Sequence, residues 1–498
     1  MHEEFRSPIL HAHPCPLWYW CFALAPSRTF LPVALIRKMC QGFRRVTPPN
    51  LSDNATAIDA ATIPQPAPSR FATTLRALRH RNFQLFFSGQ LISLVGTWMQ
   101  SVAQAWLVYR KTGSALLLGS VGFVSQFPVF LVAPFGGIAA DRVNRQRLVI
   151  ATQTASMILA AILAWLTLSG RVQVWHIFLL AALLGVVNAF DIPGRQAFLV
   201  DMVGREDLMN AIALNSSMFN GARIIGPAVA GILVARIGEG WCFAANAISY
   251  IAVIAGLFLM NVHCERRVGS GSPIDDIVEG FLWVSRTRII RTLLLLLALV
   301  SLVGMPYTVL MPIFADKILH GGARGLGILM GATGVGALFG ALTLAAKTGV
   351  KGLGRWVAIT SAAFGFSLVL FAFSKWFWVS VAMLLPVGYS MMLQMACSNT
   401  LIQTMVPNDL RGRVMALYSM SFMGLAPFGA LFGGALAHSV GAPVTVAVGG
   451  LACLVGASWF ARELPSLRLE ARRLIVAQGL AGGDPPQELN AQPVEESQ

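Results

Sequence analysis

Two kinds of ionisable side chain interrupt long apolar segments of the sequence. Asp191 and Arg195 stand at positions i and i+4 of the segment 174–199, so a helix would place them on one face. Arg223 lies near the middle of the segment 209–235. Charges at membrane depth are costly and usually mark function. In one hypothesis, Asp191 takes up and releases a proton, while Arg195 or Arg223 tunes its pKa or binds an anionic substrate. In the other, Asp191 and Arg195 form a fixed ion pair that ties their helix to its neighbours.

A second group of polar side chains is spread over other apolar segments. Its members are amides and one phenol: Gln100, Gln104, Gln126, Asn188, Asn246, Tyr307 and Gln394. If these side chains face a common cavity, they could bind a polar, aromatic ligand. Each could instead make an interhelical hydrogen bond, which contributes about 0.6 kcal/mol in a membrane.

Sequence signatures of enzymes and metal sites are absent. The chain has no Gly-x-x-x-x-Gly-Lys-Ser/Thr phosphate loop, so ATP hydrolysis is not expected. It also lacks the Cys-x-x-Cys and His-Glu-x-x-His spacings of metal sites, and its 7 cysteines show no pairing pattern. We therefore expect no enzymatic activity, no cofactor and no bound metal.

The composition indicates the environment in which these residues act. Hydrophobic residues make up 56% of the 498 residues and charged residues 12%, against about 25% in soluble domains. So few charges exclude both several soluble domains and a disordered chain. The net charge of +15 does not indicate nucleic-acid binding, because Lys and Arg occur in short groups between apolar runs. The sequence predicts a polytopic membrane protein.

Apolar segments that could cross a hydrocarbon core of about 30 Å recur twelve times. They lie near 83–109, 115–139, 147–169, 174–199, 209–235, 241–261, 291–315, 323–346, 356–374, 376–404, 412–437 and 442–461. Lys and Arg are concentrated in alternate connecting segments, and the positive-inside rule then places both termini in the cytoplasm. We expect a multi-pass protein of the inner (plasma) membrane.

The chain divides into five predicted parts. These are a disordered N-terminal extension (1–70), a six-helix bundle (71–262), a cytoplasmic linker (263–290), a second six-helix bundle (291–463) and a disordered C-terminal tail (464–498). Within the linker, Ser272-Pro273 has the composition of a helix start, and the following residues predict a helix lying at the membrane interface. The alternative is an early start of the seventh transmembrane helix.

The two predicted bundles share a sequence repeat at an offset of 203 residues. Its clearest marks are four glycine pairs: Gly221 and Gly424, Gly226 and Gly429, Gly231 and Gly434, and Gly238 and Gly441. Small residues mark close helix contacts in membranes, and a parallel repeat of six helices predicts two bundles that rock about a midplane site. At this offset Asp191 aligns with Gln394 and Arg223 with Ala426, so the charged residues occur in one half only.

The loop after the second segment resembles the signature of the major facilitator superfamily, Gly-x-Leu-x-Asp-Arg-x-Gly-Arg. The matching residues are Gly137, Asp141, Arg142 and Arg145, whereas Ala139 and Asn144 depart from the pattern. The resemblance implies a cytoplasmic gating latch. In it, Asp141 would face the N-terminal end of the eleventh helix, and the arginines would pair with an acid such as Asp201 or Glu206. The alternative is a basic loop that only sets the topology.

A second motif lies in the fifth segment. Gly226-Pro227-x-x-Ala230-Gly231 resembles the antiporter-associated motif of the same superfamily, Gly-Pro-x-x-Gly-Gly, and the resemblance implies export. The alternative is tight helix packing without directional meaning. Four further stretches are similar to the branch that contains the enterobactin exporter and the transmembrane secretion effectors: 78–83, 188–196, 210–216 and 410–415.

The resemblance and the segment pattern predict an all-α membrane protein with twelve transmembrane helices in two six-helix bundles, the major facilitator fold. The expected function is proton-coupled efflux of a small amphipathic molecule, siderophore-like or drug-like, by alternating access. Proton-coupled uptake and a non-transporting receptor or scaffold are the alternatives. We expect a monomer whose partners are a small-molecule substrate, the proton and the lipid bilayer, and no nucleic acid.

Overall fold

The computed structural model describes residues 76–204, 206–262, 273–347, 349 and 352–477. The predicted extension over residues 1–70 and the first ten residues of the predicted linker lie outside the described residues. The described part is built from helices and contains twelve that are long and apolar enough to cross a membrane. The predicted fold class is therefore confirmed.

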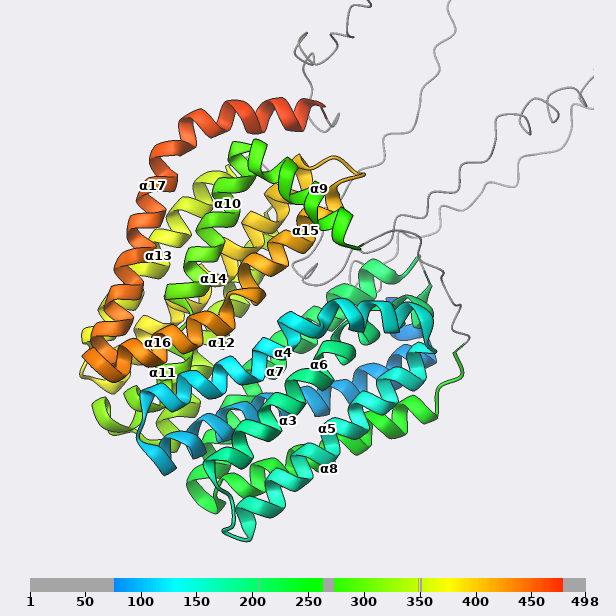
Figure 1. The fold of residues 1–498 in the computed structure, drawn as a ribbon, viewed down its shortest axis with the longest axis vertical. Helices are drawn as coiled ribbons and strands as arrows, with labels where there is room; N and C mark the ends of the chain where they lie inside the picture. Colours follow the sequence, from blue (N-terminus) through cyan, green and yellow to red (C-terminus); the bar gives the residue numbers. More distant parts are fainter. Residues whose placement is uncertain (1–75, 205, 263–272, 348, 350–351, 478–498) are drawn as a thin grey trace, which may run out of the picture.

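The N-terminal bundle begins after the short helix η1 (Arg76–Arg79) and contains six long helices (Figure 1). They are α3 (Arg81–Thr112), α4 (Ala115–Arg142), α5 (Arg145–Leu168), α6 (Val174–Val203), α7 (Leu208–Ile237) and α8 (Glu239–Phe258). The connections between them are short, so consecutive helices run antiparallel. Polar caps fix two of the starts: the Ser114 side chain accepts from the Leu117 amide, and that of Asn144 from the Arg147 amide.

The C-terminal bundle also has six membrane spans, and two of them are broken by π-helical turns. The seventh span consists of α10 (Arg288–Leu299), η2 (Val300–Gly304), α11 (Tyr307–Ile313) and η3 (Phe314–Ile318). The eleventh consists of α15 (Arg411–Ser419), η4 (Met420–Gly424) and α16 (Ala426–Val440). The remaining spans are α12 (Gly322–Ala346), α13 (Leu353–Phe373), α14 (Phe377–Met405) and α17 (Ala442–Ala477). Such π-turns inside α-helices are frequent at functional sites.

The predicted tail over residues 464–498 is corrected by α17, which continues as helix to Ala477. Residues 478–498 lie outside the described part. Pro465 lies inside α17, and a proline removes one backbone hydrogen bond and bends the helix. Figure 1 shows the end of α17 turned sharply away from the axis of the bundle. The last turns of α17 therefore leave the membrane-spanning direction without ending the helix.

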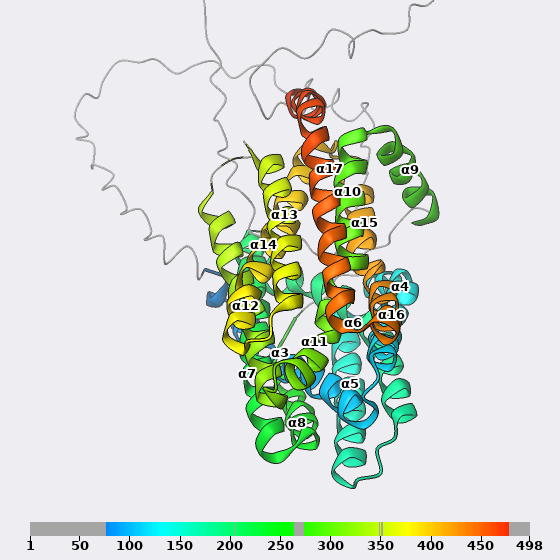
Figure 2. The ribbon, with the colours of Figure 1, turned by 90° about the vertical axis from the view of Figure 1, so that its left-hand side faces the viewer.

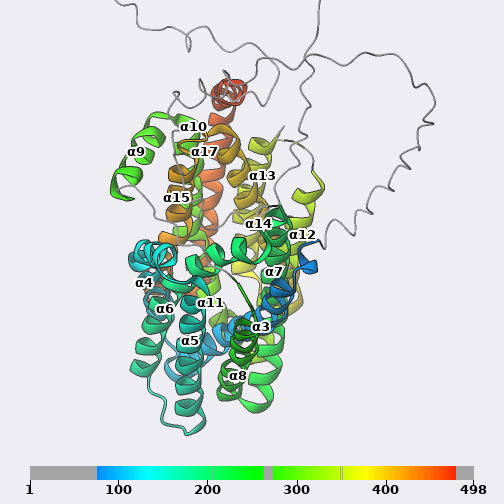
Figure 3. The same ribbon diagram turned by 90° about the vertical axis from the view of Figure 1, so that its right-hand side faces the viewer.

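The helix predicted in the linker is α9 (Pro273–Arg286), and Thr287 separates it from α10. It is therefore not an early start of the seventh span. A salt bridge of 2.6 Å between Glu279 and Arg413 holds α9 against α15, and Figures 2 and 3 show α9 at the flank of the C-terminal bundle beside α15. Its apolar residues Phe281 and Leu282 are exposed, at 62% and 50%. Its position at a membrane interface stays a prediction.

The two bundles meet along two helix pairs, α4 with α16 and α7 with α12 (Figure 2). Both pairs cross at glycine. An alanine methyl at Gly327 would lie 2.5 Å from the Pro227 carbonyl oxygen and 2.8 Å from the Gly231 Cα, and one at Gly434 would lie 2.7 Å from the Gly119 Cα. We call these four glycines, Gly119, Gly231, Gly327 and Gly434, the inter-bundle seam. From the seam the bundles diverge toward the end that carries α9 (Figure 1).

The seam has a direct consequence for stability. We expect Gly327→Ala to lower the thermal unfolding temperature of the purified protein, because forcing one carbon into a tightly packed backbone contact costs about 1–3 kcal/mol. Gly221→Ala is the matched control: it also lies in a helix, on α7, and has no atom within 4 Å of its methyl position. Its unfolding temperature should stay unchanged or rise, since alanine favours helix. Equal unfolding temperatures for the two variants would contradict this account of the seam.

Candidate functional site

Asp191 lies in the middle of α6, twelve residues before its last residue Val203 and therefore about 18 Å from that end. The helix continues four residues beyond the predicted boundary at 199, so Asp191 lies further from the end of its helix than the sequence indicated. The residue is only 2% exposed. A carboxylate at this depth needs partners for its charge.

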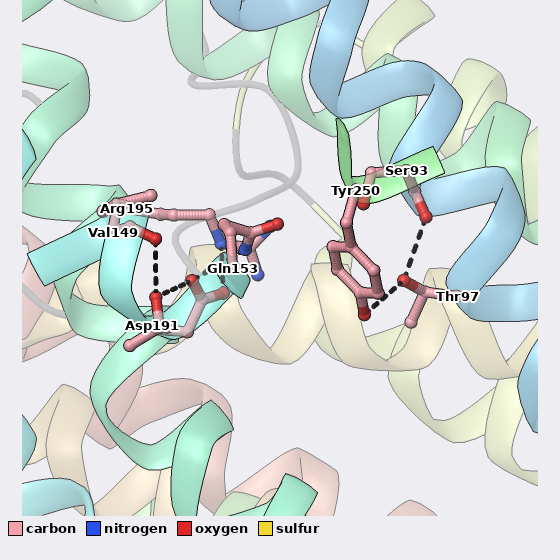
Figure 4. Close-up of polar contacts among 8 residues, drawn as sticks. Ser93, Thr97, Val149, Gln153, Asp191, Arg195 and Tyr250 are labelled. Atoms are coloured by element: carbon pink, nitrogen blue, oxygen red, sulfur yellow. Dashed lines mark hydrogen bonds and ion pairs between the residues drawn. The ribbon is translucent and has the colours of Figure 1, made fainter. Parts of the chain in front are cut away.

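One cation and two hydrogen-bond donors surround the Asp191 carboxylate (Figure 4). Its Oδ2 lies 2.7 Å from Nε of Arg195, one helical turn further along α6. Its Oδ1 accepts from the Thr152 hydroxyl at 2.7 Å and from the Gln153 amide at 2.8 Å, both on α5. The sequence therefore predicted the Asp191–Arg195 pair, and the structure adds that the same carboxylate ties α6 to α5.

Sequence reasoning missed Thr152 and Gln153. The one signal was the run of polar residues Thr152-Gln153 near the start of an apolar segment, but nothing in the sequence shows which helix it faces. It also missed Tyr250, on α8, which Figure 4 places beside the Asp191 group. The Tyr250 hydroxyl lies 3.5 Å from that of Thr97 on α3. Polar groups from α3, α5, α6 and α8 thus lie together inside the N-terminal bundle.

Arg223, the third predicted intramembrane charge, belongs to a different part of the molecule. It lies on α7, and its guanidinium carbon is 5.8 Å from the centre of the Trp98 ring on α3. Among the described residues, the ion-pair partner of Asp191 is Arg195 and not Arg223. The structure therefore separates Arg223 from Asp191, although one of the sequence hypotheses had Arg223 act on Asp191.

The predicted gating loop joins α4 to α5, and it ends in a buried ion pair that involves Arg145. This arginine is buried, and its Nη1 lies 2.9 Å from both carboxylate oxygens of Asp201 on α6. Of the two acids that were predicted as partners, Asp201 pairs with Arg145. Arg142 is exposed. Asp141 lies in the last turn of α4, and its side chain is outside the described part of the structure.

Two details of this loop differ from what the family pattern implies. Asn144 has φ of −61° and is the N-cap of α5, so the residue at a family glycine position needs no left-handed conformation. Gly137 has no atom within 4 Å of its methyl position, whereas its neighbour Gly136 directly contacts the Ala189 carbonyl oxygen of α6. In this conformation, Gly136 and not Gly137 is the glycine that allows α4 and α6 to approach closely.

The motif in α7 lies where three helices meet. Gly226 packs against α3 at Val95 and Trp98, while the Pro227 carbonyl and Gly231 contact Gly327 of α12. The first glycine therefore packs within the N-terminal bundle, and the proline and second glycine form half of the inter-bundle seam. These contacts are those expected if the motif serves for tight helix packing. An export direction stays a prediction.

The seven polar residues predicted to line a cavity do not form one group. Gln100 accepts a hydrogen bond of 2.7 Å from Asn246, and both are buried, so the alternative of an interhelical hydrogen bond holds for this pair. Gln104 and Asn188 are half-buried and Gln126 is exposed. Tyr307 and Gln394 are 1% and 0% exposed, and neither the phenol nor the amide has a hydrogen-bond partner within the described residues.

Twelve apolar spans in two like-built bundles, with a buried carboxylate network in one of them, define a membrane transporter of the major facilitator fold. The solved structure of the nucleoside transporter NupG has the same fold: it aligns with a TM-score of 0.60 at 14% identity, covering 78% of this chain and 99% of that one. Residues 72–475 match the family model described as transmembrane secretion effector, so the chain belongs to this family.

Named relatives agree with this assignment. The chain is 27% identical over 394 residues to the staphyloferrin A transporter of Staphylococcus aureus, covering 77% of this chain and 97% of that protein. It is also 27% identical over 394 residues to the multidrug efflux pump Tap of Mycolicibacterium fortuitum, covering 72% and 90%. The macrolide efflux protein A of Streptococcus pyogenes matches at 26% over 247 residues, 48% of this chain and 60% of that one. The protein is thus a multi-pass transporter of the plasma membrane and not an enzyme.

The buried Arg145–Asp201 pair gives the next prediction. Removing one partner leaves the other charge buried, which typically costs about 3–5 kcal/mol, so Arg145→Gln should lower the unfolding free energy by about this amount. Chemical unfolding of the purified protein in detergent measures the effect. Arg147→Gln, at the exposed arginine two residues on, should change stability by less than about 0.5 kcal/mol. The double variant Arg145→Gln with Asp201→Asn should recover part of the loss. Equal stability of the two single variants would contradict this role for Arg145.

Proposed function

We propose that this chain is a proton-coupled exporter of a small amphipathic molecule, siderophore-like or drug-like, and that Asp191 is its proton site. The observation that carries the proposal is a carboxylate in the middle of a membrane helix, held by one ion pair and two hydrogen bonds, in one bundle only. At the corresponding position of the other bundle stands Gln394, which cannot titrate. A single titratable carboxylate is what a one-site proton carrier requires.

The geometry supports a specific consequence of protonation. The ionised carboxylate pairs with the Arg195 guanidinium and accepts hydrogen bonds from Thr152 and Gln153, so it holds α6 against α5. A bound proton removes the negative charge, and the attraction to the Arg195 guanidinium falls with it. The Arg195 side chain is 24% exposed, so it can move toward solvent when the pair breaks. Protonation would thereby loosen a contact between two membrane helices, which is the kind of switch that alternating access needs.

The inter-bundle contacts support alternating access. Both glycine crossings of the seam, and a hydrogen bond of 3.0 Å from the Tyr109 hydroxyl to Asp316, lie toward one end of the bundles. Because the bundles meet at one end and diverge at the other (Figure 1), separating them at the seam and closing them at the opposite end would exchange which end is open. The proposal includes cytoplasmic termini, a monomeric transporter and outward transport. Outward transport is supported by the relatives named as efflux proteins.

The test uses everted membrane vesicles that contain the full chain. A radiolabelled macrolide and staphyloferrin A serve as probes, because relatives are named for these compounds. We expect accumulation of at least one probe when the vesicle interior is acidified, and loss of accumulation when the gradient is collapsed. Gradient-independent accumulation would remove the proton coupling. Accumulation only in right-side-out vesicles would indicate uptake, and no transport of either probe would favour a receptor or scaffold.

Asp191→Asn separates a coupling role from a structural one. The amide keeps the size of the side chain and cannot titrate, so we expect normal expression with gradient-driven transport reduced to background. Asp191→Glu, which keeps a carboxyl group, should retain measurable transport. Thr152→Val is the structural control, because it removes one donor to Asp191 without removing the acid. If Asp191→Asn transports like the unaltered protein with the same pH dependence, Asp191 is a structural ion-pair residue.

A further inference from the structure

Arg223 is a membrane-embedded cation with no carboxylate partner among the described residues. Within the segments long and apolar enough to cross the membrane, the last of which ends at Arg468 in α17, every acid with a described side chain is held by another group. These pairs are Asp191 with Arg195, Asp201 with Arg145, Glu239 with Arg110, Asp316 with Tyr109, and Glu463 with Arg288. The negative charge that would balance Arg223 is therefore missing from the described protein interior.

The surroundings of Arg223 come from both bundles. Trp98 of α3 presents its ring to the guanidinium group, with the central carbon 5.8 Å from the ring centre. Tyr307 lies on α11 of the C-terminal bundle, and α11 packs against α3, the helix that carries Trp98. The backbone of α12 runs alongside, because a methyl at Gly334 would lie 3.3 Å from the Arg223 carbonyl oxygen. Arg223 thus lies at the junction of the two bundles.

The Tyr307 hydroxyl is the second unsatisfied group at this junction. Tyr307 is 1% exposed, and its hydroxyl has no hydrogen-bond partner in the described part of the chain. Native proteins rarely leave a buried hydroxyl unpaired, because it loses its hydrogen bonds to water without replacing them. Arg223 is half-buried, and a partly desolvated cation without a counter-ion also carries a free-energy cost, of which a single cation–π contact offsets only part. Both groups are donors, so one acceptor that carries negative charge would satisfy both.

We propose that Arg223 and Tyr307 bind a carboxylate group of the transported molecule, with the Trp98 ring against its apolar or aromatic part. This inference rests on the proposed transport function and names the substrate class, an amphipathic organic acid. The planar guanidinium group matches the two oxygens of a carboxylate, and the phenol supplies one further donor. Because the repeat places Ala426 where Arg223 would recur, the junction offers one cationic group rather than two.

The experiment compares two probes of nearly the same size and shape, a negatively charged carboxylate and a neutral amide. Binding of 1-naphthoate and of 1-naphthamide to the purified full-length protein is measured by isothermal titration in detergent, without any proton gradient. We expect the unaltered protein to bind the carboxylate about 10- to 100-fold more tightly than the amide, as charge-assisted hydrogen bonds to a half-buried cation predict. Arg223→Gln should abolish this preference and leave the affinity for the amide unchanged.

Two further variants keep the test decisive if Arg223→Gln folds poorly. Tyr307→Phe removes one hydroxyl only and should weaken naphthoate binding by about 5-fold or more without affecting naphthamide. Arg223→Lys keeps the charge but loses the planar fork, so its preference should be intermediate. Arg236→Gln is the matched control: this arginine is exposed near the end of the same helix, and the preference should survive its replacement.

The outcome is independent of the proton-coupling proposal. Asp191→Asn should keep the preference for the carboxylate, because binding is measured at equilibrium, so failure of coupling and failure of anion binding appear in different variants. A protein that binds both probes equally, or binds neither, overturns the inference. So does an Arg223→Gln variant that binds the amide normally and retains the preference for the carboxylate. In that case Arg223 serves only to hold α7 against Trp98.

Discussion

Direct contact between helix backbones is the constraint on which the rest of the structure depends. Lipid tails are as apolar as the side chains, so burying an apolar side chain between membrane helices gives no hydrophobic gain. Helices therefore associate where small residues let their backbones approach closely. Such close contacts at glycine occur in both bundles. Gly185 contacts the Ser125 carbonyl, and Gly388 contacts the Thr333 carbonyl in the same relation. The sequence repeat pairs Gly231 of α7 with Gly434 of α16. Each of these glycines contacts a helix of the opposite bundle: Gly231 contacts α12, and Gly434 contacts α4. The twofold relation of the bundles is thus built from glycines.

The two bundles repeat in shape but not in charge. Asp191 and Gln394 correspond at the offset of 203 residues. Around Asp191, α5 supplies Thr152 and Gln153, and all three side chains bond together. Gln394 is fully buried, with neither amide atom hydrogen-bonded within the described chain. The two bundles therefore share a scaffold but differ in their buried polar groups, and the titratable carboxylate at this position lies in the N-terminal bundle only.

Local patterns in the sequence were enough to predict part of the fold and part of the site. Apolar length predicted the twelve spans, helical spacing predicted the Asp191–Arg195 pair, and the loop motif led to the contact between Arg145 and Asp201. Such patterns could not predict contacts set by the rotation of one helix against another. The donors on α5, the Gln100–Asn246 pair and the close approach at Gly136 are of this kind. The tail was misjudged because its charged residues resemble those of a disordered segment, although α17 continues through them.

One helix, α4, connects the inter-bundle seam, the Asp191 group and the gating loop. At one end, α4 begins at the seam, where Gly119 contacts Gly434. Further along, Gly136 contacts the carbonyl of Ala189, two residues before Asp191 on α6. At its other end, α4 enters the loop in which Arg145 pairs with Asp201, also on α6. A change in how α6 is held at Asp191 therefore acts on α4 directly, and α4 is one of the two helices of its bundle that touch the other bundle through the seam. Because packed interiors transmit displacement rather than absorb it, a change of charge at Asp191 has a short physical route to the seam between the bundles.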